Sequence, residues 1–204
     1  MTVVVEDKDL ARRLRRYRKR TGTDRYDEVW DGVYVMAAMP NNEHQQFVNK
    51  LAFALETVVG QPGRGLVFPG VNVSDRPDRW KRNYRCPDVA VFLAGNPAED
   101  RGTHWYGGPD LAVEIVSPGD RSRRKLPFYA KVGTREVLIL DRDPWRLELF
   151  RLADGAMSSV GVSTPESGGT LRTVSAPFTW RLVAAPDRPR VELVCSETGQ
   201  RWVV

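Results

Sequence analysis

The sequence predicts an α/β protein, with helices packed on a mixed central β-sheet of four or five strands. Three observations support this fold class. Helical and extended segments alternate irregularly, in the order helix, hairpin, helix, strands, helix, strands, which differs from a regular series of strand–helix–strand units. Residues 110–116 are apolar on both faces, which is typical of a central strand. The length of 204 residues, 41% of them hydrophobic, suits one domain with elaborations.

The first third of the chain predicts a helix, a hairpin and a second helix. Residues 7–20 combine many basic residues with apolar ones at helical spacing, and Gly22 follows as a terminator. Residues 28–36 are two apolar runs joined by Asp-Gly, which favours a tight hairpin turn. Residues 43–59 predict the second helix, capped by Asn41 or Asn42. Its apolar face is predicted from Phe47, Leu51, Phe53, Leu55 and Val58.

The middle of the chain predicts the buried strands of the sheet. These are expected at 88–93, 110–116 and 136–141, followed by an alternating strand at 146–151. A helix at about 121–132 is expected between them, with Asp120 as its cap and Gly133 as its stop. We therefore divide the chain into a basic N-terminal helix (1–22), a central domain (23–152) and a β-rich C-terminal extension (153–204) that packs on the domain or on a partner.

Composition narrows the class of protein. No apolar run approaches the roughly 20 residues that span a bilayer, so no membrane association is expected. Cys86 and Cys195 provide neither a disulfide framework nor a zinc quartet, and there is no secretory signal at the N-terminus, so we expect a cytoplasmic protein. The net charge of +5 is compatible with a polyanionic partner.

Two carboxylates stand out because they occupy predicted buried strands. Asp88 opens the run Pro-Asp-Val-Ala-Val, and Glu114 lies inside Leu-Ala-Val-Glu-Ile-Val. Acidic residues are almost never fully buried unless they are paired, so both side chains require a compensating cation. Basic runs at 81–85 and 121–125 flank them in sequence, which favours attraction of phosphate. Carboxylates on neighbouring strands suggest a divalent metal site that hydrolyses phosphodiesters.

These motifs resemble the Uma-type family of putative restriction endonucleases, within the PD-(D/E)XK nuclease superfamily. The resemblance covers roughly residues 25–152. It rests on the hairpin segment 26–32, on Pro40 to His44, on the two carboxylate-bearing strands, and on residues 125–133 and 136–141. It implies a restriction endonuclease-like fold and Mg²⁺-dependent cleavage of DNA, with Mn²⁺ as a substitute ion and no organic cofactor.

The resemblance also implies roles for individual residues. Asp88 and Glu114 would hold the metal, and the carbonyl oxygen of Ile115 is a further candidate ligand. Glu43, at the start of the second predicted helix, matches an acidic residue that commonly completes such sites. Lys125 would stabilise charge on the phosphate.

The sequence departs from the superfamily pattern at the lysine. This residue is expected two positions after the glutamate, where the chain has Val116, and Lys125 stands at the matching place in the following helix. Pro127 fits only the first turn of a helix, so that helix would begin near Lys125. Lys131, Arg124 and Arg123 are the other candidate cations.

Structural explanations of the same residues stay open at this point. Glu114 could form an ion pair with Arg85 or Arg121. Glu43 could simply favour the positive end of a helix dipole, and His44 is either a general base or a hydrogen-bonded residue. The alternative function is an inactive nuclease-fold protein that binds nucleic acid or a protein partner. A third possibility is a soluble protein in which the strand carboxylates serve only as partners in ion pairs. A homodimer would provide the two cuts that double-strand cleavage needs.

Overall fold

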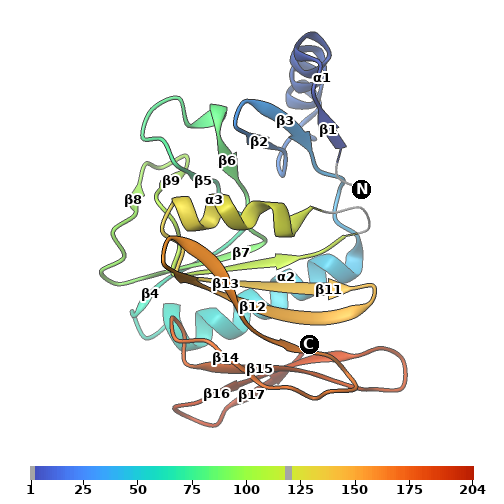
Figure 1. Ribbon diagram of the computed structural model, residues 1–204, viewed down its shortest axis with the longest axis vertical. Coiled ribbons are helices and arrows are strands. Elements are labelled where there is room, and N and C mark those ends of the chain that lie inside the picture. The colour runs from blue at the N-terminus through green and yellow to red at the C-terminus, as the bar shows by residue number, and fades with distance from the viewer. Residues whose placement is uncertain (1–2, 118–120) are drawn as a thin grey trace.

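A six-stranded mixed sheet forms the centre of the computed structural model, which describes residues 3–117 and 121–204 (Figure 1). Its strands lie in the order β13 (Ala156–Ser163), β12 (Trp145–Ala153), β11 (Glu136–Arg142), β10 (Leu111–Ile115), β7 (Val89–Leu93) and β4 (Gly65–Pro69). Strands β10 and β11 are parallel, and the other neighbouring pairs are antiparallel. All of β10 is buried, so the predicted central strand is confirmed.

The sheet has one strand more than the sequence predicted. The additional strand, β13, lies in the segment that we assigned to the C-terminal extension, where Ser and Gly made the sequence resemble a loop. It pairs with β12 across a turn at Asp154 and Gly155, which both have positive φ angles of 51° and 78°. This Asp-Gly turn is the same hairpin signal that we used for residues 28–36 and did not apply here.

The two faces of the sheet are covered by different helices. One face packs against α2 (Asn42–Leu55), which continues as a π-helical turn at Glu56–Gly60. The other face packs against the short helix α3 (Leu126–Lys131). Because side chains alternate along a strand, Leu111, Val113 and Ile115 of β10 face α2, whereas Ala112 faces α3. Glu114 therefore points to the α3 side.

Helix α2 begins as predicted, because the Asn41 side chain accepts a hydrogen bond from the His44 N–H (2.9 Å). The apolar face predicted for it is wrong at one residue. Phe53 is 60% exposed, although Phe47 and Leu51 are fully buried. Phe53 lies about 240° around the helix from Phe47, at about 100° per residue, and so points away from the sheet.

The C-terminal extension forms a four-stranded antiparallel sheet on the α2 side of the molecule (Figure 1). Its strands are β14 (Leu171–Arg172), β15 (Phe178–Val183), β16 (Arg190–Cys195) and β17 (Arg201–Val203). Trp180 and Leu193 from this sheet belong to the same buried apolar cluster as Leu51 of α2. The extension thus packs on the central domain, while the division of the chain at 22 and 152 stays a prediction.

The N-terminal segment forms the other end of the molecule. Helix α1 (Lys8–Thr21) ends at Gly22, as predicted, and none of its residues is buried. The structure adds that Asp7 caps its start. It packs beside a sheet of short strands that includes the predicted hairpin of β2 and β3. The strands of this sheet are β1 (Val3–Val5), β2 (Glu28–Trp30), β3 (Val33–Met36), β5 (Val73–Ser74), β6 (Tyr84–Arg85), β8 (Glu99–Asp100) and β9 (Trp105–Tyr106).

Two short 3-10 turns complete the described structure, at Trp80–Arg82 and Ser122–Lys125. The second turn leads directly into α3, and Pro127 lies in the first turn of that helix, as predicted from its ring geometry. The predicted cap Asp120 lies outside the described residues. Among the described helices, none is both long and apolar enough to span a membrane.

Candidate active site

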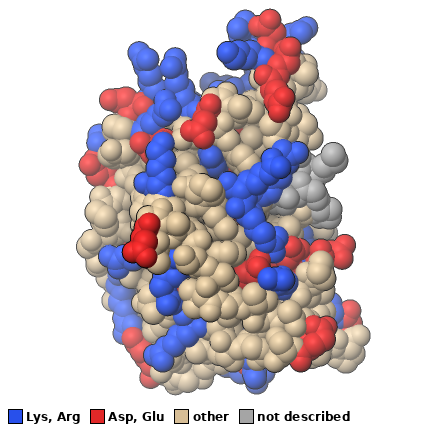
Figure 2. Space-filling view, in the orientation of Figure 1, with Lys and Arg blue, Asp and Glu red and all other residues tan. Residues whose placement is uncertain are grey.

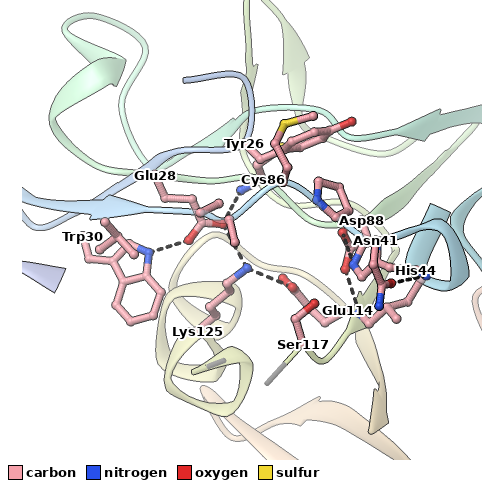
Figure 3. A pocket seen from close by; sticks show the side chains of 16 residues that line it. Tyr26, Glu28, Trp30, Asn41, His44, Cys86, Asp88, Glu114, Ser117 and Lys125 are labelled. Atoms are coloured by element: carbon pink, nitrogen blue, oxygen red, sulfur yellow. Dashed lines mark hydrogen bonds and ion pairs between the residues drawn. The ribbon is translucent and has the colours of Figure 1, made fainter. Parts of the chain in front are cut away.

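A cavity of about 260 Å³ opens between the central six-stranded sheet and the N-terminal sheet that contains β2 and β3, beside the amino-terminal end of α2 (Figure 3). Asp88 and Glu114 line it from the central sheet, and Lys125 reaches it from the turn before α3. Ile115 also contributes to the wall. The structure therefore brings four of the five predicted site residues to one cavity. Their catalytic and metal-binding roles remain predictions.

Glu114 is 2% exposed, and both of its carboxylate oxygens accept hydrogen bonds. The Lys125 ammonium donates to Oε2 at 2.8 Å, and the Tyr129 hydroxyl of α3 donates to Oε1. Lys125 thus supplies the cation that burial of Glu114 requires. Neither arginine that we considered as a partner does so: Arg85 instead donates to the Val29 carbonyl.

Lys125 is itself 8% exposed and lies between two carboxylates. Its ammonium is 2.8 Å from Glu114 Oε2 and 2.9 Å from Glu28 Oε1 (Figure 3). The late start of α3 at Leu126 leaves Lys125 in the preceding turn, from which its side chain reaches the cavity. Of the other candidate cations, Lys131 pairs with Asp75 and Arg123 pairs with Asp141 and Glu148, and Arg124 is exposed and does not line the cavity.

Asp88 lies immediately before β7, and its two oxygens have different partners. Oδ2 accepts the backbone N–H of Ile115 at 2.7 Å, which fixes the carboxylate against the end of β10. Oδ1 lies 3.3 Å from Nε2 of His44, which is 6% exposed at the start of α2. His44 is therefore a buried residue of this cavity, and its Nδ1 has no hydrogen-bond partner among the described residues.

Glu28 is a cavity residue that the sequence analysis missed. It is 5% exposed and lies on β2 of the hairpin. Its Oε1 accepts the N–H of Cys86 at 2.8 Å and pairs with Lys125, and its Oε2 accepts the Trp30 indole N–H at 2.5 Å. The available signal was a glutamate at the start of an apolar strand, as with Asp88, which we interpreted only as part of the hairpin.

Glu43 is the predicted site residue that does not line the cavity. Its carboxylate is held by two arginines, Arg142 Nη1 at 2.6 Å and Arg188 Nε at 3.5 Å. Arg142 also donates to the carbonyl of Val116, the residue directly after β10. Through Arg142, Glu43 links the start of α2 to the ends of strands β10 and β11. The predicted catalytic role of Glu43 remains untested.

Burial raises the pKa of Glu114 from 4.5 to about 8. The ammonium of Lys125 opposes this rise, whereas the negative charges of Asp88 and Glu28 add to it. Burial likewise raises the pKa of the Tyr129 phenol well above its ordinary value, so that Tyr129 acts as a hydrogen-bond donor to Glu114. The cavity therefore contains more negative charge than Lys125 neutralises.

We expect Glu114 to make the metal-free protein less stable as the pH rises from 4.5 to about 8. The folded-state pKa lies above the unfolded one, so the stabilising contribution is complete below pH 4.5 and is lost as the pH passes about 8. Glu114→Gln should flatten this part of the stability profile. Denaturant unfolding in EDTA across this pH range measures the effect, and identical profiles for the two proteins would contradict it.

The oxygen donors of the cavity fit a hard divalent cation. Mg²⁺ is commonly held by one or two carboxylates and keeps several waters. Asp88, Glu114 and the Ile115 carbonyl match this chemistry, and each carboxylate retains acceptor positions beyond its present hydrogen bonds. Within the described part of the chain, no group of three or more His, Cys, Asp or Glu side chains is arranged to hold a metal. Bound ions would therefore depend on few protein ligands.

Comparison with solved structures supports a nuclease-like fold. A crystal structure described as a putative nuclease belonging to DUF820, from Anabaena variabilis, is similar with a TM-score of 0.60. The sequence identity is 18%, and the match covers 75% of this chain and 84% of that one. At this identity the likeness concerns the fold alone. A comparison with curated proteins found no match.

The family is established by sequence. The model of the family Uma2, described as "Putative restriction endonuclease", matches residues 9–185, which is most of the chain. The protein therefore belongs to this family, and the resemblance inferred from the motifs is confirmed. The match extends beyond the 25–152 segment in which we had recognised motifs, into α1 on one side and β15 on the other.

Proposed function

We propose that this protein is a metal-dependent DNA endonuclease whose active site is the cavity formed by Asp88, Glu114 and Lys125. The observation that supports this most is the meeting of two acidic strand ends and a buried ammonium in one open cavity. Membership of a family described as "Putative restriction endonuclease" supports DNA as the substrate. Basic side chains gathered over the start of α3 offer further attraction for phosphate (Figure 2).

Each residue of the cavity has a role in this proposal. Asp88 and Glu114 would hold Mg²⁺, together with the Ile115 carbonyl. The ion would supply the positive charge that polarises the phosphodiester and lowers the pKa of an attacking water. Lys125 would neutralise the charge that develops on the phosphate. Glu28 would keep the Lys125 ammonium in place through the contact of 2.9 Å.

Nicking of supercoiled plasmid tests this function. The wild-type protein is expected to convert the plasmid to open-circular and linear forms in Mg²⁺ or Mn²⁺, and to leave it intact in EDTA. DNA binding is measured beside cleavage by the shift of a labelled duplex. Absence of cleavage in both ions, at protein concentrations that bind the duplex, would overturn the proposal.

The second candidate function is an inactive nuclease-fold protein that binds DNA or a protein partner. The contacts of Glu114 favour it, because both carboxylate oxygens already accept hydrogen bonds from Lys125 and Tyr129. In this case the cavity would be a closed ion-pair network rather than a metal site. Salt-sensitive DNA binding without cleavage in either ion would support this function over the nuclease.

A further inference from the structure

Helix α1 has a row of basic side chains along one face. Lys8, Arg12, Arg15, Arg16 and Lys19 fall within an arc of about 100° when residues are placed at 3.6 per turn. All five line a cavity of about 660 Å³ between α1 and the hairpin of β2 and β3. We call these five residues the α1 basic row.

The orientation of this row is fixed by packing on the adjacent face of the helix. Leu14 and Ala11 pack against the buried cluster of Val29 and Tyr34 in the hairpin sheet. Arg18 is directed the same way, and its guanidinium binds the buried Asp27 carboxylate at 2.7 Å. The α1 basic row is thus held in a constant position at the end of the molecule where α1 lies (Figure 1).

The positive surface continues beyond α1. Arg15 and Lys19 also line a neighbouring cavity of about 450 Å³, and Arg25 and Lys81 contribute to it from the following segments. The Lys81 ammonium lies 5.4 Å from the centre of the partly buried Trp80 ring, which also lines this cavity, so that the wall combines cations with an aromatic side chain. Such a mixture is suited to a nucleic-acid backbone and its bases.

The hairpin separates this surface from the candidate active site. Glu28 and Trp30 of β2 line the active-site cavity. Val29, between them in sequence, lines the cavity beside α1, because neighbouring side chains in a strand point to opposite faces. A duplex that contacts α1 would therefore lie one hairpin away from Asp88 and Glu114.

We propose that the α1 basic row binds the phosphate backbone of a DNA duplex and so holds it next to the active-site cavity. The row runs from Lys8 to Lys19, which is about 16 Å at 1.5 Å per residue. Measured along the axis of a duplex, that length spans about five base steps at 3.4 Å each. Arg12 pairs with Asp9 at 3.3 Å, and the other four cations of the row leave a net positive charge along the helix that fits a regular polyanion better than a folded protein surface. The inference rests on the proposed DNA substrate, and it assigns the surface that binds it.

The test is a salt titration of duplex binding in EDTA, where no cleavage occurs. The variant Lys8→Gln/Arg16→Gln/Lys19→Gln removes three exposed cations whose side chains contact no described residue through an ion pair or hydrogen bond. Its matched control, Lys50→Gln/Arg172→Gln, removes two exposed cations from α2 and β14, and it is compared with the double variant Lys8→Gln/Arg16→Gln as well as with the triple variant. Fluorescence anisotropy of a labelled duplex gives the affinity, and circular dichroism checks the fold of each variant.

We expect the α1 variant to bind about tenfold more weakly or worse at low salt, and its slope of log affinity against log salt to fall by about 2 to 3. The single variant Arg16→Gln should lower the slope by about 0.9. The control should keep the affinity of the wild-type protein. Unchanged binding by the α1 variant, or equal weakening in the control, would overturn the inference. If the wild-type protein binds through α1 but never cleaves, the inference stands and the nuclease proposal fails.

Discussion

Asp88→Asn is expected to abolish DNA cleavage and to leave the fold intact. Asparagine keeps a side-chain oxygen that accepts the Ile115 N–H, now at 2.7 Å, so the end of β10 should stay in place. It removes the negative charge that the proposed metal requires. Loss of a residue that only orients a metal ligand typically lowers activity by about 10- to 100-fold. Because Asp88 would be a ligand itself, we expect cleavage to fall by more than about 100-fold.

The control for this prediction is Glu43→Gln. Glu43 is also an acidic residue near the start of α2, but it pairs with Arg142 and Arg188 and does not line the cavity. Cleavage of supercoiled plasmid is measured for both variants, with duplex binding in EDTA as a check. If Asp88→Asn cleaves as well as the wild-type protein, the metal site is not where we propose it. If Glu43→Gln is equally inactive, Glu43 shares the role that its sequence motif implies.

Lys125→Met is expected to cause the largest loss of stability among the substitutions in this site. It removes the ammonium that contacts both Glu28 and Glu114 and leaves these two carboxylates buried. Breaking a buried ion pair by removing one partner costs about 3 to 5 kcal/mol. The loss should be smaller under acidic conditions, because a protonated carboxyl group does not need the ammonium.

Urea unfolding at acidic and at mildly alkaline pH measures this effect. The matched control is Lys131→Met, six residues further along the chain, which removes an ion pair with Asp75 from a lysine whose side chain is 60% exposed. Its effect should stay below about 1 kcal/mol. Equal stability of the two variants at alkaline pH would contradict the view that Lys125 neutralises the buried carboxylates.

Much of the fold could be predicted because its signals are local. The cap at Asn41, the hairpin around Asp31 and Gly32, and the doubly apolar strand at 110–116 each depend on neighbouring residues, and the structure contains all of them. Strand β13 was missed because its sequence is not typical of a strand, and its pairing with β12 determines its conformation. Phe53 was misplaced because apolar residues need not all lie on one helix face.

Burial alone predicted the candidate site only where a buried strand contained an acidic residue, and Lys125 was predicted from the resemblance to the family. Asp88 and Glu114 stood out for that reason. Glu28 and Tyr129 did not, because the contacts that bring them to the cavity join elements far apart in the sequence. Glu28 contacts Lys125 from β2 of the N-terminal sheet. Tyr129 contacts Glu114 because α3 covers the face of β10 to which Glu114 points. The contacts themselves follow from tertiary packing, although the position of Glu28 in an apolar strand was a local signal that we did not use.

The central claim is that Asp88 and Glu114 form a metal site, and crystals soaked in Mn²⁺ test it most directly. Anomalous diffraction locates the ion without reference to activity. The account predicts an anomalous peak in the cavity, within coordination distance of both carboxylates, and its loss in crystals of Asp88→Asn. A cavity without such a peak, in which Glu114 keeps its contacts with Lys125 and Tyr129, would contradict the account and leave a nuclease fold whose buried carboxylates serve ion pairs.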